Sequence, residues 1–339
     1  MRPQANIRAP GPAREDEPRA ERASGPERPA TTDRASVPGR LGTAERPSDR
    51  ERPGAPERAQ AAGIVLAGGR STRMGRPKAW LEWHGSTLLH RVAGILARAV
   101  DGPVVVVRAP GQELPALPPG VRVVEDAREG RGPLQGLAAG LTAVADDADL
   151  AYVSSTDVPF LHPAFVARVL AAAAHEDADV ALPVAHGFRH PLAAAYRTSL
   201  LANVEELIAL DRMRPAFLFE RCRALELDEQ ALLRDTALAR SDPDLLSLMN
   251  VNDPGEYERA RGRGAPIVTV RRFGTLAPAS DREPLELRAA TLAAAAAAAG
   301  VPLDRHVVAA VNGEQITRDP ELPLAAGDTV AFLAADAGG

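Results

Sequence analysis

A glycine-rich turn that carries the chain's only lysine is the first group of residues that could bind a phosphate. The turn begins Leu66-Ala67-Gly68-Gly69 and continues through Arg73 to Lys78, the one lysine among the 40 lysine and arginine residues. Glycines let backbone amides approach phosphate oxygens, and a lysine supplies a compact, movable charge where an arginine presents a larger planar group. These residues predict a phosphate-binding site; the alternative is a surface turn in which one lysine happened to survive.

A carboxylate at the end of an expected strand is the second group. Asp157 follows the apolar run 150–153 through Ser154-Ser155-Thr156. Ligands of open α/β sheets collect at the carboxyl ends of strands, and Mg²⁺ binds through few carboxylates together with substrate phosphates. Asp157 is therefore a candidate magnesium ligand, with a helix-capping aspartate as the alternative.

Further polar residues follow other apolar runs. Glu125-Asp126 closes the run 121–124, and a glycine-proline turn over 132–136 then leads into a helical pattern. Asn250 and Asn252 alternate in Asn-Val-Asn-Asp-Pro directly before an expected helix, where an amide could instead serve as the cap. These positions predict a shared polar rim at the carboxyl edge of one sheet.

Short apolar runs that alternate with amphipathic stretches must position these groups. The expected strands are 63–66, 104–107, 121–124, 150–153, 180–183 and 191–196, most of them buried on both faces. The expected helices are 88–99, 134–145, 163–174, 199–210, 216–222 and one that starts at Asp253-Pro254. The alternation predicts a mainly parallel, doubly wound, Rossmann-like α/β sheet over residues 61–261.

A second, smaller unit is expected over residues 266–339, after a linker at 262–265. Its pattern predicts strands at 267–273 and 284–287, an alanine-rich helix that ends at Gly300, and strands at 307–311, 314–316 and 329–333. Asn312-Gly313 favours the positive backbone angles of a type I′ turn. This order is that of a ubiquitin-like β-grasp domain, and its terminal Gly338-Gly339 could thread a narrow channel in a partner because neither residue has a side chain.

Composition limits the remaining possibilities. Residues 1–60 are rich in Arg, Pro and Glu and poor in apolar residues, so a disordered tail is expected there. The net charge of −5 gives no support for nucleic-acid binding, and no apolar run could form a membrane span or a signal peptide. A single cysteine, Cys222, excludes a disulfide framework within the chain, and we expect it to be a buried core thiol. A cytoplasmic protein is the expectation.

Five motifs, in this order along the chain, resemble the molybdenum cofactor guanylyltransferases, which have the nucleotide-diphospho-sugar transferase fold. The motifs are Leu-Ala-Gly-Gly with Arg-Met-Gly and Lys78, Glu125-Asp126 with Gly-Pro-Leu-x-Gly, Thr156-Asp157-x-Pro, His190-Pro191-Leu, and Asn-Val-Asn-x-Pro. The resemblance covers about residues 63–261. It implies a Mg²⁺-dependent transfer of GMP from GTP to the phosphate of molybdenum-bearing molybdopterin, with release of pyrophosphate.

The resemblance also implies roles for single residues. Those implied to bind the nucleotide are Leu66, Ala67, Gly68, Gly69, Arg73, Lys78, Asp126, Asp157, Asn250 and Asn252. Among them, Lys78 would contact the phosphates, Asp126 the nucleoside part, and Asp157 both the nucleotide and Mg²⁺. Lys78 and Asp157 are therefore the expected catalytic residues.

The C-terminal unit resembles the small sulfur-carrier subunit of molybdopterin synthase and its relative in thiamine synthesis. In that family the terminal Gly-Gly is activated as an acyl-adenylate and converted to a thiocarboxylate. The resemblance implies thiocarboxylation at Gly339, with an adenylating or sulfur-transfer enzyme and the large subunit of molybdopterin synthase as partners.

Two other functions stay open at this point. One is a transferase of the same fold that uses CTP, or that adds a nucleotide to another phosphate. The other is a sulfur carrier or scaffold that acts through Gly339 while its transferase domain only binds a nucleotide.

Overall fold

The computed structural model describes residues 61–68, 74–126, 132–277 and 283–334. All of these belong to one compact unit, Pro56–Gly339. The expected disordered tail over 1–60 lies outside the described residues, as do Gly69, Arg73 and Gly339.

A mainly parallel sheet forms the centre of the larger domain. Its strands are β1 (Ala61–Leu66), β4 (Val104–Arg108), β5 (Arg122–Glu125), β6 (Leu150–Ser155), β7 (Val180–Ala185), β8 (Phe188–Arg189), β9 (Ala193–Arg197) and β10 (Ala224–Asp228). The order across the sheet is β10-β7-β9-β6-β1-β4-β5, with β8 paired to β7. Strand β1 runs parallel to both β4 and β6, whereas β9 is antiparallel to β6 and β7. The expected mixed α/β fold with a parallel-rich sheet is confirmed.

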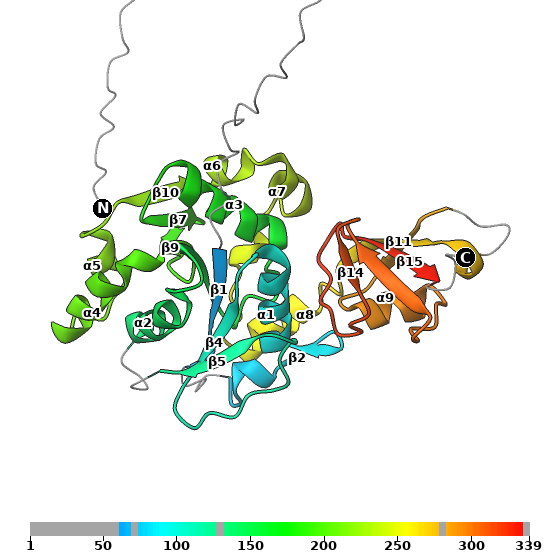
Figure 1. The fold of residues 1–339 in the computed structure, drawn as a ribbon, viewed down its shortest axis with the longest axis horizontal. Helices are drawn as coiled ribbons and strands as arrows, with labels where there is room; N and C mark the ends of the chain where they lie inside the picture. The colour runs from blue at the N-terminus through cyan, green and yellow to red at the C-terminus, as the bar shows by residue number, and fades with distance from the viewer. Residues whose placement is uncertain (1–60, 69–73, 127–131, 278–282, 335–339) are drawn as a thin grey trace, which may run out of the picture. The chain divides into compact units, whose positions relative to one another are not determined.

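Helices cover both faces of this sheet. The helical segments of this domain are η1 (Lys78–Trp80), α1 (Leu88–Ala99), α2 (Pro133–Val144), α3 (Pro163–His175), η2 (Thr198–Leu200), α4 (Leu201–Ala209), α5 (Ala216–Phe219), α6 (Glu229–Leu233), α7 (Thr236–Ser241), η3 (Leu246–Leu248) and α8 (Pro254–Arg261). A short hairpin of β2 (Glu82–Trp83) and β3 (Ser86–Thr87) precedes α1. Figure 1 shows β1 and β4 between α1 on one side and α2 with α4 on the other. Neighbouring β1 residues therefore enter different cores: Val65 packs with α1 and α3, and Ile64 with α2 and α4. No helix in the described ranges is long and apolar enough to cross a membrane.

Two glycines of the 132–140 segment set how α2 lies on the sheet. Gly132 has a φ of 111°, a backbone conformation that favours glycine, and it immediately precedes Pro133 at the start of α2. A Cβ on Gly140 would lie 2.6 Å from Cγ2 of Ile64, so only a glycine allows this approach of α2 to β1. Backbone conformation thus explains Gly132, the first residue of the Gly-Pro-Leu-x-Gly motif, and close packing explains Gly140, which lies after the motif.

Several sequence-based expectations for this domain were wrong in detail. The segment 224–241 was not expected to hold β10, α6 and α7, and the helix expected at 216–222 ends at Phe219. Most of the expected strands are buried on both faces, and the edge strand β5, where Val123 is 43% exposed, is the exception. Cys222 is only partly buried at the rim of a core, and this burial raises the pKa of its thiol to about 11.

A separate, small β-rich domain follows. It contains β11 (Ile267–Arg272), η4 (Gly274–Leu276), β12 (Leu285–Arg288), α9 (Leu292–Ala298), β13 (Val307–Val311), β14 (Gln315–Thr317) and β15 (Thr329–Ala334). The sheet order is β12-β11-β15-β13-β14, and α9 closes a core around Val270 and Phe332. The Asn312-Gly313 turn has the expected positive φ angles, 54° and 78°. The boundaries 61–261, 262–265 and 266–339 remain predictions.

Candidate active site

Lys78 and Asp157 lie together at the carboxyl edge of the large sheet. Parallel β1 and β6 are neighbours, with Leu66 opposite Ser155, so the segments that follow both strands start at the same edge. Lys78 begins η1, and Asp157 lies two residues beyond β6. The Lys78 Nζ and Asp157 Oδ2 atoms are 2.5 Å apart, and the two side chains keep 20% and 14% of their surface exposed. Solvent therefore still reaches this ion pair.

Three more side chains complete what we call the Lys78–Asp157 cluster: Ser155, Asn250 and Asn252. Asp157 Oδ1 accepts hydrogen bonds from Ser155 Oγ at 2.6 Å and from Asn250 Nδ2 at 2.8 Å. Lys78 Nζ also donates to Asn252 Oδ1 at 3.2 Å. The backbone amide between the two asparagines donates to the Asp157 carbonyl at 2.9 Å. The cluster thus holds one ammonium and one carboxylate in fixed orientations.

Other residues cap the helices for which Asp157, Asn250 and Asn252 were the alternative caps. Helix α8 is capped by Asp253, whose Oδ1 accepts from the Glu256 amide at 2.8 Å, so neither Asn250 nor Asn252 serves as that cap. Helix α3 is capped by His162 in place of Asp157, because His162 Nδ1 accepts from the Ala164 amide at 3.1 Å. The side chains of Asp157 and the two asparagines are therefore available for the cluster.

The start of the glycine-rich turn is held by two side chains from other segments. Thr156 Oγ1 donates to the Leu66 carbonyl at 3.1 Å, and Gln112 Nε2 donates to the Ala67 carbonyl at 3.0 Å. Gln112 is itself fixed, since its Oε1 accepts from the Ala109 amide at 2.9 Å. A Cβ on Gly68 would lie 3.5 Å from that same amide nitrogen, an ordinary contact, so packing inside the protein does not require this glycine.

Asp126 lies at a different strand end from the cluster. Strands β1 and β4 separate β5 from β6 in the sheet, and the Asp126 amide donates to the Arg108 carbonyl at 2.8 Å. The adjacent Glu125 accepts from Arg108 Nη2 at 2.9 Å, so an arginine partly neutralises this strand end. The nucleoside-binding role of Asp126 stays a prediction.

Sequence reasoning missed two residues of this site. Ser155 was noted only as part of the run before Asp157; its i,i+2 spacing to that carboxylate was the available signal. Gln112 had no local signal, because its partner Ala67 lies 45 positions away in the sequence.

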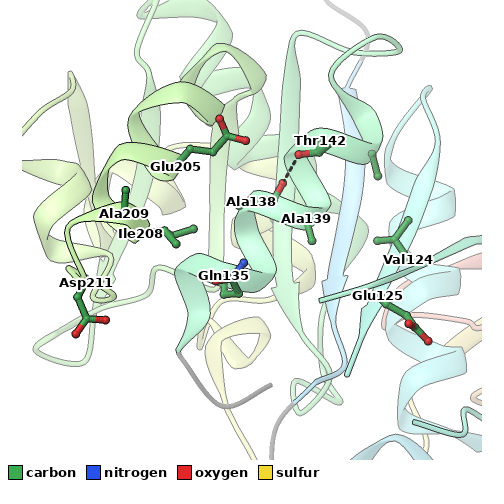
Figure 2. Close-up of a pocket in the computed structure, with 11 residues that line it drawn as sticks. Val124, Glu125, Gln135, Ala138, Ala139, Thr142, Glu205, Ile208, Ala209 and Asp211 are labelled. Carbon is green, nitrogen blue, oxygen red and sulfur yellow. Dashed lines mark hydrogen bonds between the residues drawn. The ribbon is translucent and has the colours of Figure 1, made fainter. Parts of the chain in front are cut away.

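A pocket of 810 Å³ lies beside α2, α4 and the end of β5 (Figure 2). It is lined by Val124, Glu125, Gln135, Ala138, Ala139, Thr142, Ala143, Glu205, Ile208, Ala209 and Asp211. None of these residues belongs to the Lys78–Asp157 cluster. The lining contains three carboxylates and no lysine or arginine, so the Lys78–Asp157 cluster, which has an ammonium, is the better candidate for binding a triphosphate.

Both domains of the chain match known protein families. The MobA-like NTP transferase domain matches residues 63–225, and the ThiS family matches residues 270–339. A Mycobacterium tuberculosis protein named "Probable molybdenum cofactor guanylyltransferase" is 41% identical over 169 residues, which cover 49% of this chain and 82% of that protein. The chain belongs to the molybdenum cofactor guanylyltransferase family. The resemblance inferred from the five motifs is confirmed.

Two further comparisons belong with these. A protein of the same name from Mycobacterium avium is 42% identical over 153 residues, which cover 44% of this chain and 76% of the relative. The crystal structure of molybdopterin-guanine dinucleotide biosynthesis protein A from Archaeoglobus fulgidus aligns with 60% of this chain and 97% of that one, at 21% identity and a TM-score of 0.48. As a member of the molybdenum cofactor guanylyltransferase family, the chain is a nucleotidyltransferase, and it carries a ubiquitin-like domain of the ThiS family.

Asp157 is the one carboxylate of the Lys78–Asp157 cluster and its candidate metal ligand. Within the described ranges no group of three or more His, Cys, Asp or Glu residues could hold a metal ion. Mg²⁺ in phosphoryl-transfer enzymes is commonly held through one or two carboxylates, with substrate phosphates and water as the other ligands. Asp157, a single, partly exposed carboxylate at the strand end, fits that chemistry.

Proposed function

We propose that this chain transfers GMP from GTP to the phosphate of molybdenum-bearing molybdopterin in a Mg²⁺-dependent reaction that releases pyrophosphate. The Lys78–Asp157 cluster is the observation that carries the proposal: an ammonium and a carboxylate lie 2.5 Å apart at the carboxyl ends of neighbouring strands. Such a pair can serve a nucleotide triphosphate and its metal at once. The guanylyl group and the molybdenum cofactor in this proposal are supported by the names of the relatives.

The chemistry asks for charge neutralisation more than for proton transfer. A phosphate oxygen of the acceptor attacks the α-phosphorus of GTP, and the bond to the bridging oxygen breaks, so that pyrophosphate leaves with the electron pair. The attacking phosphate is already ionised at neutral pH, so no side chain has to remove a proton. When bound, Mg²⁺ would neutralise charge on the phosphates.

The chain's own residues supply the remaining interactions. Lys78 would donate to the phosphate oxygens and offset the charge that develops in the transition state. Asp157 would hold the metal, and its carboxylate is kept in one orientation by Ser155 and Asn250. Asn252 keeps the Lys78 ammonium at the site. Preorganised charges of this kind stabilise the transition state without having to reorganise during the reaction.

The direct test is pyrophosphate release by the purified full chain, with molybdopterin that carries molybdenum as acceptor and each of the four ribonucleoside triphosphates in turn. We expect GTP to give the highest kcat/KM. A higher kcat/KM with CTP would transfer the proposal to a cytidylyltransferase. Absence of release with all four nucleotides would refute a transferase function with this acceptor.

The ThiS-family match over residues 270–339 favours a second role for the C-terminal domain. We propose that an adenylating enzyme joins the Gly339 carboxylate to the AMP part of ATP with release of pyrophosphate. A donor of sulfur at the oxidation level of sulfide then displaces AMP, which leaves a thiocarboxylate for molybdopterin synthase. Intact mass after incubation with that class of enzyme, ATP and a sulfur donor tests this. A gain equal to the mass difference between sulfur and oxygen supports it, an unchanged mass contradicts it, and a chain without Gly339 is the control.

A further inference from the structure

Three residues on one face of helix α1 make the closest polar and steric contacts between this helix and the C-terminal domain. Arg91, Gly94 and Arg98 have i, i+3, i+7 spacing, which places them on one face of a helix. Their partners are Ala290 and the segment 323–328, which precedes β15. This face of α1 is therefore the seat of the C-terminal domain.

A buried ion pair holds one end of the seat. The Arg98 guanidinium meets the Asp328 carboxylate with two hydrogen bonds of 2.8 and 2.9 Å, and the side chains are only 5% and 3% exposed. Asp328 also accepts from the Ala325 amide at 2.7 Å and from Asn312 Nδ2 at 2.8 Å. Burial by itself raises the pKa of Asp328, but the bonds and charge of Arg98 outweigh it and hold this pKa below its usual range. A buried pair with this geometry fixes the register of the segment against α1.

The middle of the seat is shaped by the absence of a side chain. A Cβ on Gly94 would lie 2.7 Å from Cγ and 2.8 Å from Cδ of Pro323. Those distances are too short for carbon atoms in contact, and the proline ring cannot rotate away. Only glycine at position 94 allows α1 and the segment 323–328 to approach this closely.

Arg91 connects the seat to the active site. Its side chain is buried, with 4% exposure, and its Nε donates to the Pro159 carbonyl at 2.7 Å. Its Nη1 donates to the carbonyls of Leu324 at 3.1 Å and Ala290 at 3.4 Å. One guanidinium therefore bridges the backbone two residues after Asp157 to the backbone of the C-terminal domain.

A second contact runs in parallel. His162, at the end of the same segment 157–162, donates from Nε2 to the Ala326 carbonyl at 3.0 Å while its Nδ1 caps α3. Burial lowers the pKa of His162, and a neutral ring with the proton on Nε2 makes both bonds. Segment 157–162, which carries Asp157, is thus bonded to the C-terminal domain at two places. Arg91 links the domain to Pro159 near the middle of the segment, and His162 at the end of the segment bonds to the domain directly.

We propose that the seated C-terminal domain is part of the support of the transferase active site, with Arg91 as the positioning residue that fixes the Pro159 carbonyl and, through it, the Asp157 segment. The inference deepens the proposed function and rests on it for the role of Asp157 in metal and nucleotide binding. A partner that draws the C-terminal domain away from α1 would weaken nucleotide transfer. Because coupling between two sites is reciprocal, Mg²⁺ and GTP would in turn tighten the seat.

The test uses a steric wedge and its relief in the full chain. Gly94→Ala introduces a Cβ that collides with the Pro323 ring, and Pro323→Ala removes the two colliding atoms. We expect Gly94→Ala to raise the Mg²⁺ concentration for half-maximal pyrophosphate release about fivefold or more, the low end of typical coupling between sites. The double variant Gly94→Ala/Pro323→Ala should return toward the wild-type value, and Pro323→Ala alone should differ little from wild type.

Hydrogen exchange supplies a readout independent of activity. Gly94→Ala should speed amide exchange in both 323–328 and 157–162, and the double variant should restore protection in both segments. Faster exchange in 323–328 with unchanged exchange and Mg²⁺ dependence at 157–162 would overturn the positioning role. Unchanged exchange in 323–328 would overturn the seat itself. If the wild type releases no pyrophosphate with any nucleotide, the proposed function fails, and exchange in 157–162 alone decides whether the domain supports this segment.

Discussion

Two ion pairs made from the same kinds of groups lie in different surroundings in this molecule. Lys78–Asp157 keeps 20% and 14% of its side-chain surface exposed, whereas Arg98–Asp328 keeps 5% and 3%. In each pair the aspartate also accepts a hydrogen bond of 2.8 Å from an asparagine side chain. Both pairs use an aspartate, and they differ in the cation and in access to solvent.

The difference distinguishes an ion pair that is suited to binding a ligand from one that is suited to holding the fold together. A partly exposed pair can exchange its partner for a ligand, because either charge can return to water when the other is taken. A lysine suits this use, since its point charge can move between acceptors, whereas the arginine fork suits a fixed two-bond contact with a carboxylate. The first pair should therefore control turnover, and the second should control stability.

Removing the buried aspartate should have the largest effect. Asp328→Ala leaves Arg98 buried without its counter-ion, and we expect a loss of about 3–5 kcal/mol in the free energy of unfolding. Urea denaturation measures it. The matched control is Asp147→Ala, which breaks an Arg–Asp pair whose side chains are 46% and 44% exposed. Exposed pairs contribute about 0–1 kcal/mol. If Asp147→Ala lost as much unfolding free energy as Asp328→Ala, burial would not explain the contribution of the Arg98–Asp328 pair.

Neutralising the exposed aspartate should affect turnover and spare stability. Asp157→Asn removes the charge that the proposed metal site needs, and we expect pyrophosphate release to fall roughly 10²- to 10³-fold, the loss typical of a preorganised electrostatic group. The control Asp235→Asn makes the same chemical change at the cap of α7, where asparagine caps equally well. Near wild-type release by Asp157→Asn would contradict its assigned role.

Acid should weaken the buried pair in a defined direction. The pKa of Asp328 is lowered in the folded state, so its contribution is full above the unfolded pKa, about 3.9, and is lost as the pH falls through the folded pKa. Wild type and Asp328→Asn should therefore differ most in unfolding free energy near neutral pH and converge below about pH 3.9. Urea midpoints measured across pH 3 to 7 would show this. A gap that widens toward low pH would mean that Asp328 is not the stabilising anion.

The local parts of the fold could be predicted from the sequence because their signals are local. Helix α1 spans the expected Leu88–Ala99, since its apolar residues repeat on one face, and Asn312-Gly313 forms the expected turn. Strand β10 carried no such signal. It is an edge strand in which only Leu227 is fully buried, and its formation depends on pairing with β7.

The site shows the same division. The positions of Lys78 and Asp157 could be predicted from the expected strand ends, because the carboxyl ends of parallel strands meet at one edge of the sheet. The contacts of Arg91 with Pro159 and Leu324 join positions 68 and 233 apart in the sequence, and no local pattern reports them. The groups to which we assign the chemistry could be recognised in the sequence by residue type, whereas the groups that hold them in place could be recognised only in the fold.

Substitution of Gln112 should have the smallest of the expected effects. It tests, within the active site, the difference between residues that do chemistry and residues that hold them in place. Its Nε2 donates to the Ala67 carbonyl at 3.0 Å, while its Oε1 accepts from the Ala109 amide at 2.9 Å. Gln112→Glu keeps the acceptor and loses the donor, and Gln112→Leu loses both. A neutral hydrogen bond contributes about 0.5–1.5 kcal/mol, so each variant should raise the KM for GTP by up to roughly tenfold and leave kcat nearly unchanged. If Gln112→Glu behaves as wild type while Gln112→Leu does not, the bond to Ala109 orders the turn, and the Ala67 carbonyl needs no support from this side chain.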